Sequence, residues 1–253
     1  MGYPKDLLST RAIIKPGKCA LIPPEGRVNN VIPNLANCRA SILCSPDLGA
    51  KFAFYTVEVM PGGGTTHEFY GEGIETFIYC LSGEGIVNIG GKDYSIGKDG
   101  FAFAPASTPV GLHNNTSEPW SLLLYKQRYR KLEGFEAKVI VGNLNDIQEE
   151  IYDGMENVRI KNLLPNELGF DFNFHTLTFY PGACHSFVET HVQEHGIYFL
   201  QGEGVYLIDD VWVPVKKDDF IYFGPYVPQA YYAAGRSNTT YIYSKDCNRD
   251  VDL

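Results

Sequence analysis

The stretches FIYCLSGEGIVNIGG (77–91) and YFLQGEGVYLIDD (198–210) share a central Gly-Glu-Gly with an apolar run on either side. They lie within two longer segments, 56–110 and 176–229, in which the Gly, Pro and apolar positions match. Pro61 pairs with Pro181 at an offset of 120 and Gly83 pairs with Gly202 at an offset of 119, so one residue is gained or lost between these anchors. A match of this length indicates an internal duplication.

Each copy alternates apolar and polar residues in short runs that end at Gly, Pro, Asn or Asp. This pattern is typical of antiparallel strands in a barrel or sandwich, and with the duplication it predicts an all-β chain of two tandem domains. We expect the first domain within residues 1–140, where an N-terminal extension wraps the barrel, and the second within 171–253. Residues 141–170 are expected to be a linker, with weak helical signals around 145–152 and a stop at Pro165.

The composition narrows the classes of protein. The chain has 253 residues and a net charge of −9, which argues against a nucleic-acid-binding or anionic-membrane surface. Its six cysteines show no paired spacing, and we expect them to be reduced. We find no stretch with the pattern of a signal peptide or a membrane span, so a cytoplasmic location is expected.

The segment ETHVQEHG (189–196) is the candidate site, with two histidines and two carboxylates in eight residues. Glu189 and His191 share a face because residues two apart on a strand point the same way, and a turn can bring His195 back beside them. One carboxylate and two imidazoles suit Mn, Fe, Ni or Zn. The alternative is an ordinary polar turn on the outside of a β-protein.

A resemblance to the cupins favours the metal site. The pattern PG-x₆-E-T-H-x₃-H-x₆-G (181–202), followed by D-x₅-G-P-x₂-P-Q (218–229), resembles the two cupin motifs, but with changed ligands. Glu189 stands where the first His belongs, His195 replaces the Glu, and Gln229 replaces the last His, whereas His191 is retained. This set resembles the manganese site of the (S)-ureidoglycine aminohydrolase family, and the likeness extends over essentially the whole chain. The resemblance implies a bicupin, that is, two tandem antiparallel β-barrels of the jelly-roll (cupin) type.

The resemblance implies a function and a role for each residue. It implies hydrolysis of (S)-2-ureidoglycine to (S)-ureidoglycolate and ammonia in purine (allantoin) catabolism, by a homo-oligomer that holds one Mn²⁺ per chain. Glu189, His191, His195 and Gln229 would be the metal ligands, and Glu189 and Gln229 would also contact substrate.

Two further residues are implied to bind substrate, and a third is a candidate from its position on a strand. Tyr241 and Lys245 match the family's substrate-binding pair, and their spacing of four puts them on one face of a strand. Lys245 is implied to be catalytic together with Glu189; it could pair with the substrate carboxylate or transfer a proton. Tyr206 is a further candidate for the lining of the site, with core packing as the alternative.

The first copy lacks these ligands. At the offset of 119, the four ligand positions correspond to Tyr70, Glu72, Thr76 and Val110, so we expect the first barrel to be metal-free. Two other functions stay open: a different metal-dependent cupin enzyme, such as a dioxygenase or isomerase, or a non-catalytic bicupin that binds or stores a ligand.

Overall fold

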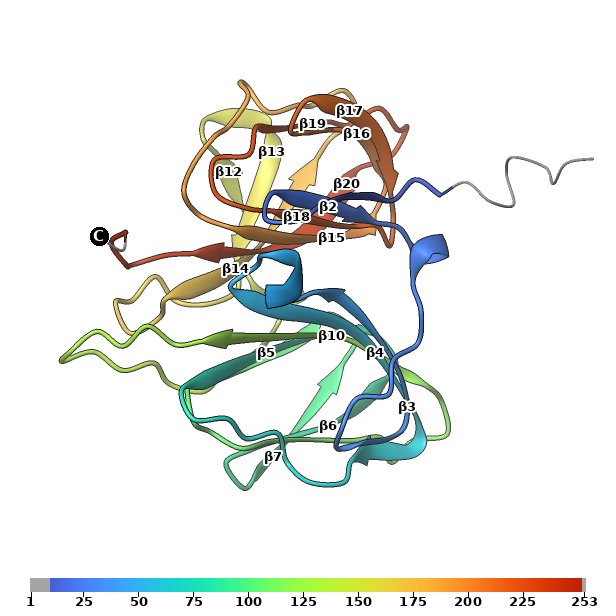
Figure 1. Cartoon of the computed structure of the whole chain (residues 1–253), viewed down its shortest axis with the longest axis vertical. Coiled ribbons are helices and arrows are strands. Elements are labelled where there is room, and N and C mark those ends of the chain that lie inside the picture. The colour runs from blue at the N-terminus through green and yellow to red at the C-terminus, as the bar shows by residue number, and fades with distance from the viewer. Residues whose placement is uncertain (1–9, 252–253) are drawn as a thin grey trace, which may run out of the picture.

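Two antiparallel β-barrels are stacked in the structure, a computed structural model that describes residues 10–251. The N-terminal half forms the lower barrel of Figure 1 and the C-terminal half forms the upper one. Within the described residues, helical turns are confined to the 3₁₀ segments η1 (Pro24–Gly26), η2 (Pro46–Leu48) and η3 (Leu144–Asp146). The all-β, two-barrel prediction is confirmed.

The lower barrel is built on a nine-stranded sheet. Eight of its strands follow the order β11-β8-β5-β10-β4-β9-β6-β7, and the ninth, β3, pairs with β4. Its strands are β3 (Leu35–Cys44), β4 (Phe52–Thr65), β5 (Ile74–Ser82), β6 (Glu84–Ile89), β7 (Lys92–Gly97), β8 (Gly100–Ala104), β9 (Val110–His113), β10 (Trp120–Arg128) and β11 (Ile140–Asn143).

The upper barrel combines an eight-stranded sheet, β1-β2-β18-β15-β20-β14-β13-β12, with a three-stranded sheet, β17-β16-β19. Its strands are β1 (Ile13–Lys15), β2 (Cys19–Ile22), β12 (Glu150–Tyr152), β13 (Met155–Asn162), β14 (Phe172–Phe179), β15 (His195–Gln201), β16 (Glu203–Ile208), β17 (Val211–Lys216), β18 (Phe220–Phe223), β19 (Gln229–Tyr232) and β20 (Thr239–Asp246).

The repeated Gly-Glu-Gly makes the same turn in both barrels. Gly83 and Gly202 have φ values of +76° and +79°, in the left-handed region that favours glycine. A Cβ on Gly83 would lie 2.4 Å from the Pro119 carbonyl oxygen, and one on Gly202 would lie 2.6 Å from that of Asn238. Glycine is therefore required twice, which explains why the duplication is most visible here.

The two barrels exchange edge strands. β2, which precedes the lower barrel in the chain, pairs with β18 of the upper one, and β11, which precedes the upper barrel, pairs with β8 of the lower one. Residues 13–22 thus extend the second barrel and not the first, contrary to our expectation for the N-terminal extension. The expected linker is not a simple connection, since it contains β12, β13 and most of β11. The predicted helix around 145–152 is also absent: only the short turn η3 forms there, because residues 150–152 pair with β13 as strand β12.

The N-terminal segment is also held by charge. Just before β1, Arg11 donates to both oxygens of Asp219, at 2.6 and 2.7 Å, and Asp219 is fully buried. The backbone N–H of Lys216 donates to the same carboxylate at 2.8 Å. Paired, charge-assisted bonds of this kind offset the cost of burying a carboxylate.

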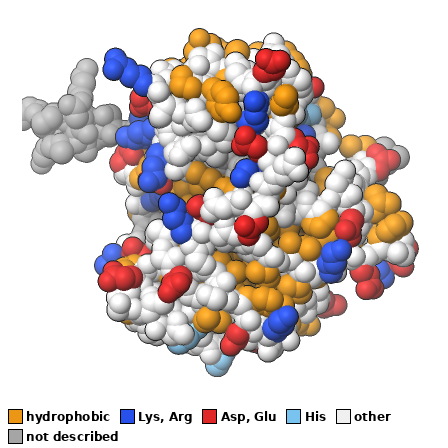
Figure 2. Space-filling view, turned by 180° about the vertical axis from the view of Figure 1, so that it is seen from behind, with side chains coloured by type: hydrophobic (Ala, Val, Ile, Leu, Met, Phe, Trp, Pro, Cys, Tyr) orange, Lys and Arg blue, Asp and Glu red, His pale blue; other side chains and the backbone are white. Residues whose placement is uncertain are grey.

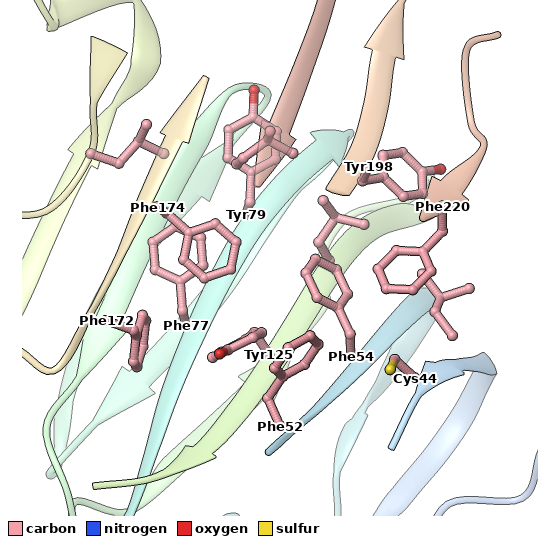
Figure 3. Packing of buried hydrophobic residues seen from close by; sticks show 14 of the residues in the cluster. Cys44, Phe52, Phe54, Phe77, Tyr79, Tyr125, Phe172, Phe174, Tyr198 and Phe220 are labelled. Carbon is pink, nitrogen blue, oxygen red and sulfur yellow. The ribbon is translucent and has the colours of Figure 1, made fainter. Parts of the chain in front are cut away.

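Aromatic residues from both barrels pack into one core between them. Phe77 of β5 stacks on Phe174 of β14 with ring centroids 3.9 Å apart and planes 7° from parallel. Phe54 of β4 lies 5.1 Å from Phe220 of β18, and Figure 3 shows these rings with Tyr125 between the strands of the two halves. Because burial of large aromatic surfaces dominates packing energy, the barrels are held in one orientation.

Candidate functional site

Backbone pairing brings the predicted site residues together inside the upper barrel. Glu189 and Gln229 form an isolated antiparallel bridge, with N–H to C=O bonds of 2.9 and 3.0 Å in the two directions. His195 is the first residue of β15 and pairs with Phe223 of β18. The backbone N–H of Tyr226 donates to the His191 carbonyl at 2.7 Å, so each of these four residues is held by the backbone.

The two histidines face each other through Nε2. His191 Nδ1 is 3.0 Å from the Gln193 carbonyl oxygen, and His195 Nδ1 is 2.8 Å from that of Ser244. A carbonyl only accepts, so both Nδ1 atoms carry the proton and both Nε2 atoms present lone pairs. The two Nε2 atoms are 3.2 Å apart. Facing lone pairs at this distance repel each other unless a cation or a proton lies between them.

Burial keeps this pair uncharged. Desolvation lowers the pKa of His195 well below its ordinary value, and the neighbouring His191 lowers it further. Desolvation also lowers the pKa of His191, and the charge of Lys245 adds to that effect. Neutral imidazoles with Nδ1–H held by carbonyls are the usual form of metal-ligating histidine.

Gln229 and Glu189 complete the donor set. The Gln229 amide nitrogen donates to His191 Nε2 at 2.9 Å, and Gln229 is buried, 3% exposed; its carbonyl oxygen is the atom that could bind a metal. Two nitrogens at a right angle around one ion, each about 2.1 Å from it, lie about 3 Å apart, which is close to the 3.2 Å between the two imidazole Nε2 atoms. Glu189 Oε2 is 4.0 Å from His191 Nε2, and its Oε1 accepts from the Tyr152 hydroxyl at 3.5 Å. Burial raises the pKa of Glu189, and Lys245 opposes the rise.

The residue types suit a divalent ion, but the four side chains do not converge on a single position that an ion could occupy. Among residues 10–251, no three His, Cys, Asp or Glu side chains form a ready cluster of ligands. The separation of Glu189 from His191 and its turn toward Tyr152 account for this. The donor set is one carboxylate oxygen, one amide and two imidazoles, without thiolate, which suits Mn²⁺ or a similar ion.

The second carboxylate of ETHVQEHG, that of Glu194, does not lie with the donor set. Glu194 is 3% exposed, and its Oε2 accepts from the Lys51 backbone N–H at 3.0 Å and from the Tyr222 hydroxyl at 3.4 Å. These partners lie on the side of the aromatic core between the barrels. Glu194 is therefore structural, because its carboxylate is bound on the side of this core and not at the donor set.

A small cavity of about 20 Å³, room for about one water molecule or ion, lies beside the donor set. Glu189, His195 and Gln229 line it. Tyr206 of β16 and Tyr241 and Lys245 of β20 line it as well, so the structure brings all three predicted substrate-binding residues to the same place. A larger groove of about 1000 Å³ lies between the barrels, and its walls include Tyr79 and Tyr198 but none of the ligand positions.

Comparison with known proteins identifies the family to which the chain belongs. The cupin domain family matches residues 55–125 and 175–244. (S)-Ureidoglycine aminohydrolase of Escherichia coli (strain K12) is 46% identical over 253 residues, which is 100% of this chain and 97% of that protein. The chain belongs to the (S)-ureidoglycine aminohydrolase family of cupins. The protein of that name from Arabidopsis thaliana is 31% identical over 95% of this chain and 79% of its own. The crystal structure of protein Ylba from E. coli, 44% identical, matches with a TM-score of 0.88 over 100% of both chains.

The lower barrel of this family member differs from the upper one at the ligand positions. Phe69 and Val110 form the bridge that corresponds to Glu189 and Gln229, so Phe69, and not Tyr70, stands in the place of Glu189. The one-residue change of offset lies between Phe69 and Val110, which shifted the correspondence that we drew from the sequence. The Lys126 ammonium, at the position of Lys245, lies 3.5 Å from the centre of the Phe69 ring. Phe69 and Val110 thus replace Glu189 and Gln229, so two of the four candidate metal ligands are missing from the lower barrel.

Three residues of the site were missed by the sequence reasoning. Tyr243 lines the cavity between Tyr241 and Lys245 on β20, and period-two alternation in YIYSK would have identified it. Tyr152 comes from β12, inside the expected linker, and no local pattern indicated it. His185 lies four residues before Glu189 and also lines the cavity, but a single histidine next to a Pro-Gly turn carries no signal by itself.

Proposed function

We propose that this protein hydrolyses (S)-2-ureidoglycine to (S)-ureidoglycolate and ammonia, with one Mn²⁺ per chain, in purine (allantoin) catabolism. The observation that carries the proposal is the full-length 46% identity to the E. coli aminohydrolase. It coincides with two neutral imidazoles whose Nε2 lone pairs face each other at 3.2 Å. The proposal rests on the family for the substrate and on the donor set for the metal.

Glu189, His191, His195 and Gln229 would hold the ion. When bound, the ion supplies Lewis-acid polarisation of the substrate. The chain contributes the orientation of the ligands, because both imidazoles are locked by their Nδ1–H bonds to Gln193 and Ser244. Locking the second nitrogen fixes the tautomer, so no proton has to leave Nε2 before the metal binds.

The remaining residues suit the handedness and charge of the substrate. Lys245 lines the cavity together with Glu189 and His195, and its charge acts to lower the pKa of Glu189 and of both histidines. We propose that it pairs with the substrate carboxylate. Glu189 and Gln229 would contact the substrate from the side of the metal, and Tyr206 and Tyr241 from the floor of the cavity. Several fixed contacts around one carbon discriminate between enantiomers.

Proton transfer falls to two of these groups. The leaving amine needs a proton and the entering water loses one. Glu189, which lines the cavity as a proposed ligand, is one candidate to accept the proton of the entering water. Lys245 is the second candidate, and we assign the catalytic role to these two residues.

We also propose a homo-oligomer in the cytoplasm. Figure 2 shows hydrophobic side chains gathered over the lower lobe, where acidic and basic side chains are interspersed. Exposed apolar patches often mark interfaces between subunits, and light scattering after gel filtration tests the proposal. Of the described helices, none is long and apolar enough to cross a membrane.

Ammonia release from freshly generated ureidoglycine is the decisive experiment. The protein is stripped with a chelator, reloaded with Mn²⁺ or left empty, and spontaneous ammonia loss is subtracted. Catalysis only in the reloaded sample is expected. Ammonia at the spontaneous rate from fully loaded protein contradicts the proposed substrate and would favour another cupin activity or a binding role.

A further inference from the structure

His185 makes two different contacts at the floor of the upper barrel. Its Nδ1 lies 3.1 Å from the backbone nitrogen of Tyr231, and its Nε2 lies 3.4 Å from the hydroxyl oxygen of Tyr241. The residue is 9% exposed, and its ring also meets Phe179 edge to face at 5.2 Å. It is not a member of the proposed ligand set.

The first contact determines the tautomer. A backbone N–H can only donate, so His185 Nδ1 must accept and carries no proton. Burial lowers the pKa of His185 to about 4, which keeps the ring neutral near pH 7. A neutral ring without a proton on Nδ1 has its proton on Nε2. His185 therefore donates to the Tyr241 oxygen.

The Tyr241 hydroxyl then has to donate elsewhere. The Tyr241 ring packs against that of Tyr206, with centroids 6.2 Å apart, and both side chains are buried. Because Tyr241 accepts from His185, its own proton is left for an acceptor in the cavity that both tyrosines line.

The lower barrel shows which part of this arrangement the fold requires. Leu112, at the position of Tyr231, donates its backbone N–H to Thr65 Oγ1 at 3.1 Å, and Thr65 stands at the position of His185. A threonine therefore satisfies the strand as well as a histidine does. The positions of Tyr241 and Tyr206 are Leu122 and Val87, both buried in the apolar core of the lower barrel. The contact of His185 Nε2 with a tyrosine hydroxyl therefore has no counterpart in the lower barrel, where the position of Tyr241 is an apolar leucine.

We propose that His185 is a positioning residue that orients the Tyr241 hydroxyl, so that Tyr241 presents a hydrogen-bond donor to a substrate oxygen in the cavity. The series runs from His185 Nε2–H to the Tyr241 oxygen and from the Tyr241 hydroxyl to the substrate. It selects an oxygen acceptor, of the carboxylate or urea-carbonyl class, at this point of the substrate. The choice of substrate rests on the proposed function, but the direction of the series does not.

The direction of the series is tested without any activity. Long-range ¹H–¹⁵N correlation spectra of the histidine-labelled, Mn²⁺-free protein report the protonated nitrogen of each ring. We expect His185, identified by its absence from the His185→Thr spectrum, to be in the Nε2–H form near pH 7. An Nδ1–H form or an imidazolium overturns the inference, even if the protein proves active on ureidoglycine.

The effect on the substrate is tested with variants that copy the lower barrel. His185→Thr keeps an acceptor for Tyr231 N–H but has no donor for Tyr241, and should raise KM for ureidoglycine about tenfold with a smaller change in kcat. His185→Gln carries an acceptor and a donor on one amide and should recover most of this loss. Thr65→Val, the matched control, should leave KM unchanged.

Metal content and circular dichroism confirm that each variant is folded and loaded. A His185→Thr protein with native KM, or a His185→Gln protein no better than His185→Thr, overturns the positioning role. A wild-type protein without ureidoglycine activity would refute the proposed function instead, and the tautomer measurement would still decide the direction of the series.

Discussion

Replacing Glu75 by Gln should stabilise this protein more at alkaline than at acidic pH. Glu75 lies on β5 at the boundary between the barrels, is 1% exposed, and neither of its oxygens has a hydrogen-bond partner as a carboxylate. Its contact with Asp171, which is 2% exposed, becomes a hydrogen bond only if one of the two carboxyls is protonated. Burial, reinforced by Asp171, raises the pKa of Glu75 to about 11.

The sign follows from linkage. The folded pKa lies above the ordinary value of 4.5, so the folded state holds a proton that the unfolded chain releases. The stability that this proton contributes is complete below about pH 4.5 and is lost as pH rises toward about 11. One such proton changes the unfolding free energy by about 1.4 kcal/mol per pH unit, or about 2.7 kcal/mol between about pH 6.5 and 8.5.

Urea unfolding at several pH values measures this difference. Glutamine keeps the shape and a donor for Asp171 but cannot ionise, so the stability of Glu75→Gln relative to wild type should grow by about 2.7 kcal/mol over that pH range. Glu72→Gln, on an exposed neighbour, should show no such trend. A pH-independent difference for Glu75→Gln would mean that Glu75 is ionised in the folded protein, with Arg249 as the nearby cation, and would refute the reasoning.

The other predictions concern the metal, the substrate and the N-terminal segment. Elemental analysis should find one Mn²⁺ per chain and none in His195→Ala, whose far-UV spectrum should remain that of a β-protein; two equivalents, or a loaded variant, would place the ligands elsewhere. Lys245→Met should keep the metal but lose roughly thirty- to several-thousand-fold in kcat/KM, corresponding to about 2–5 kcal/mol, whereas Lys126→Met should stay near wild type; equal losses would contradict the role of Lys245. Arg11→Met should lower the unfolding free energy by about 2–3 kcal/mol, because the fully buried Asp219 loses two hydrogen bonds. An unchanged midpoint of urea unfolding would show that the Arg11–Asp219 ion pair does not stabilise the fold.

Local patterns in the sequence determined the β-class and the duplication. Alternation with period two specifies a strand within a few residues, and the turn at Gly83 and Gly202 requires the same residue for the same steric reason in both copies. The spacing of Glu189, His191 and His195 was legible as a candidate site because these residues are close in the chain. Gln229, Tyr241 and Lys245 were assigned only through the resemblance to a family.

The tertiary structure decided which distant segments meet. Nothing in the alternation of residues 13–22 says that β2 pairs with β18 across about two hundred residues, and nothing around Tyr152 indicates that it reaches Glu189. An edge strand can satisfy its hydrogen bonds on any free edge, so its partner is chosen by the packing of the assembled barrels. The role of His185 is decided in the same way, because Nδ1 and Nε2 are distinguished only by the two groups, 46 and 56 residues away, that the fold places beside them.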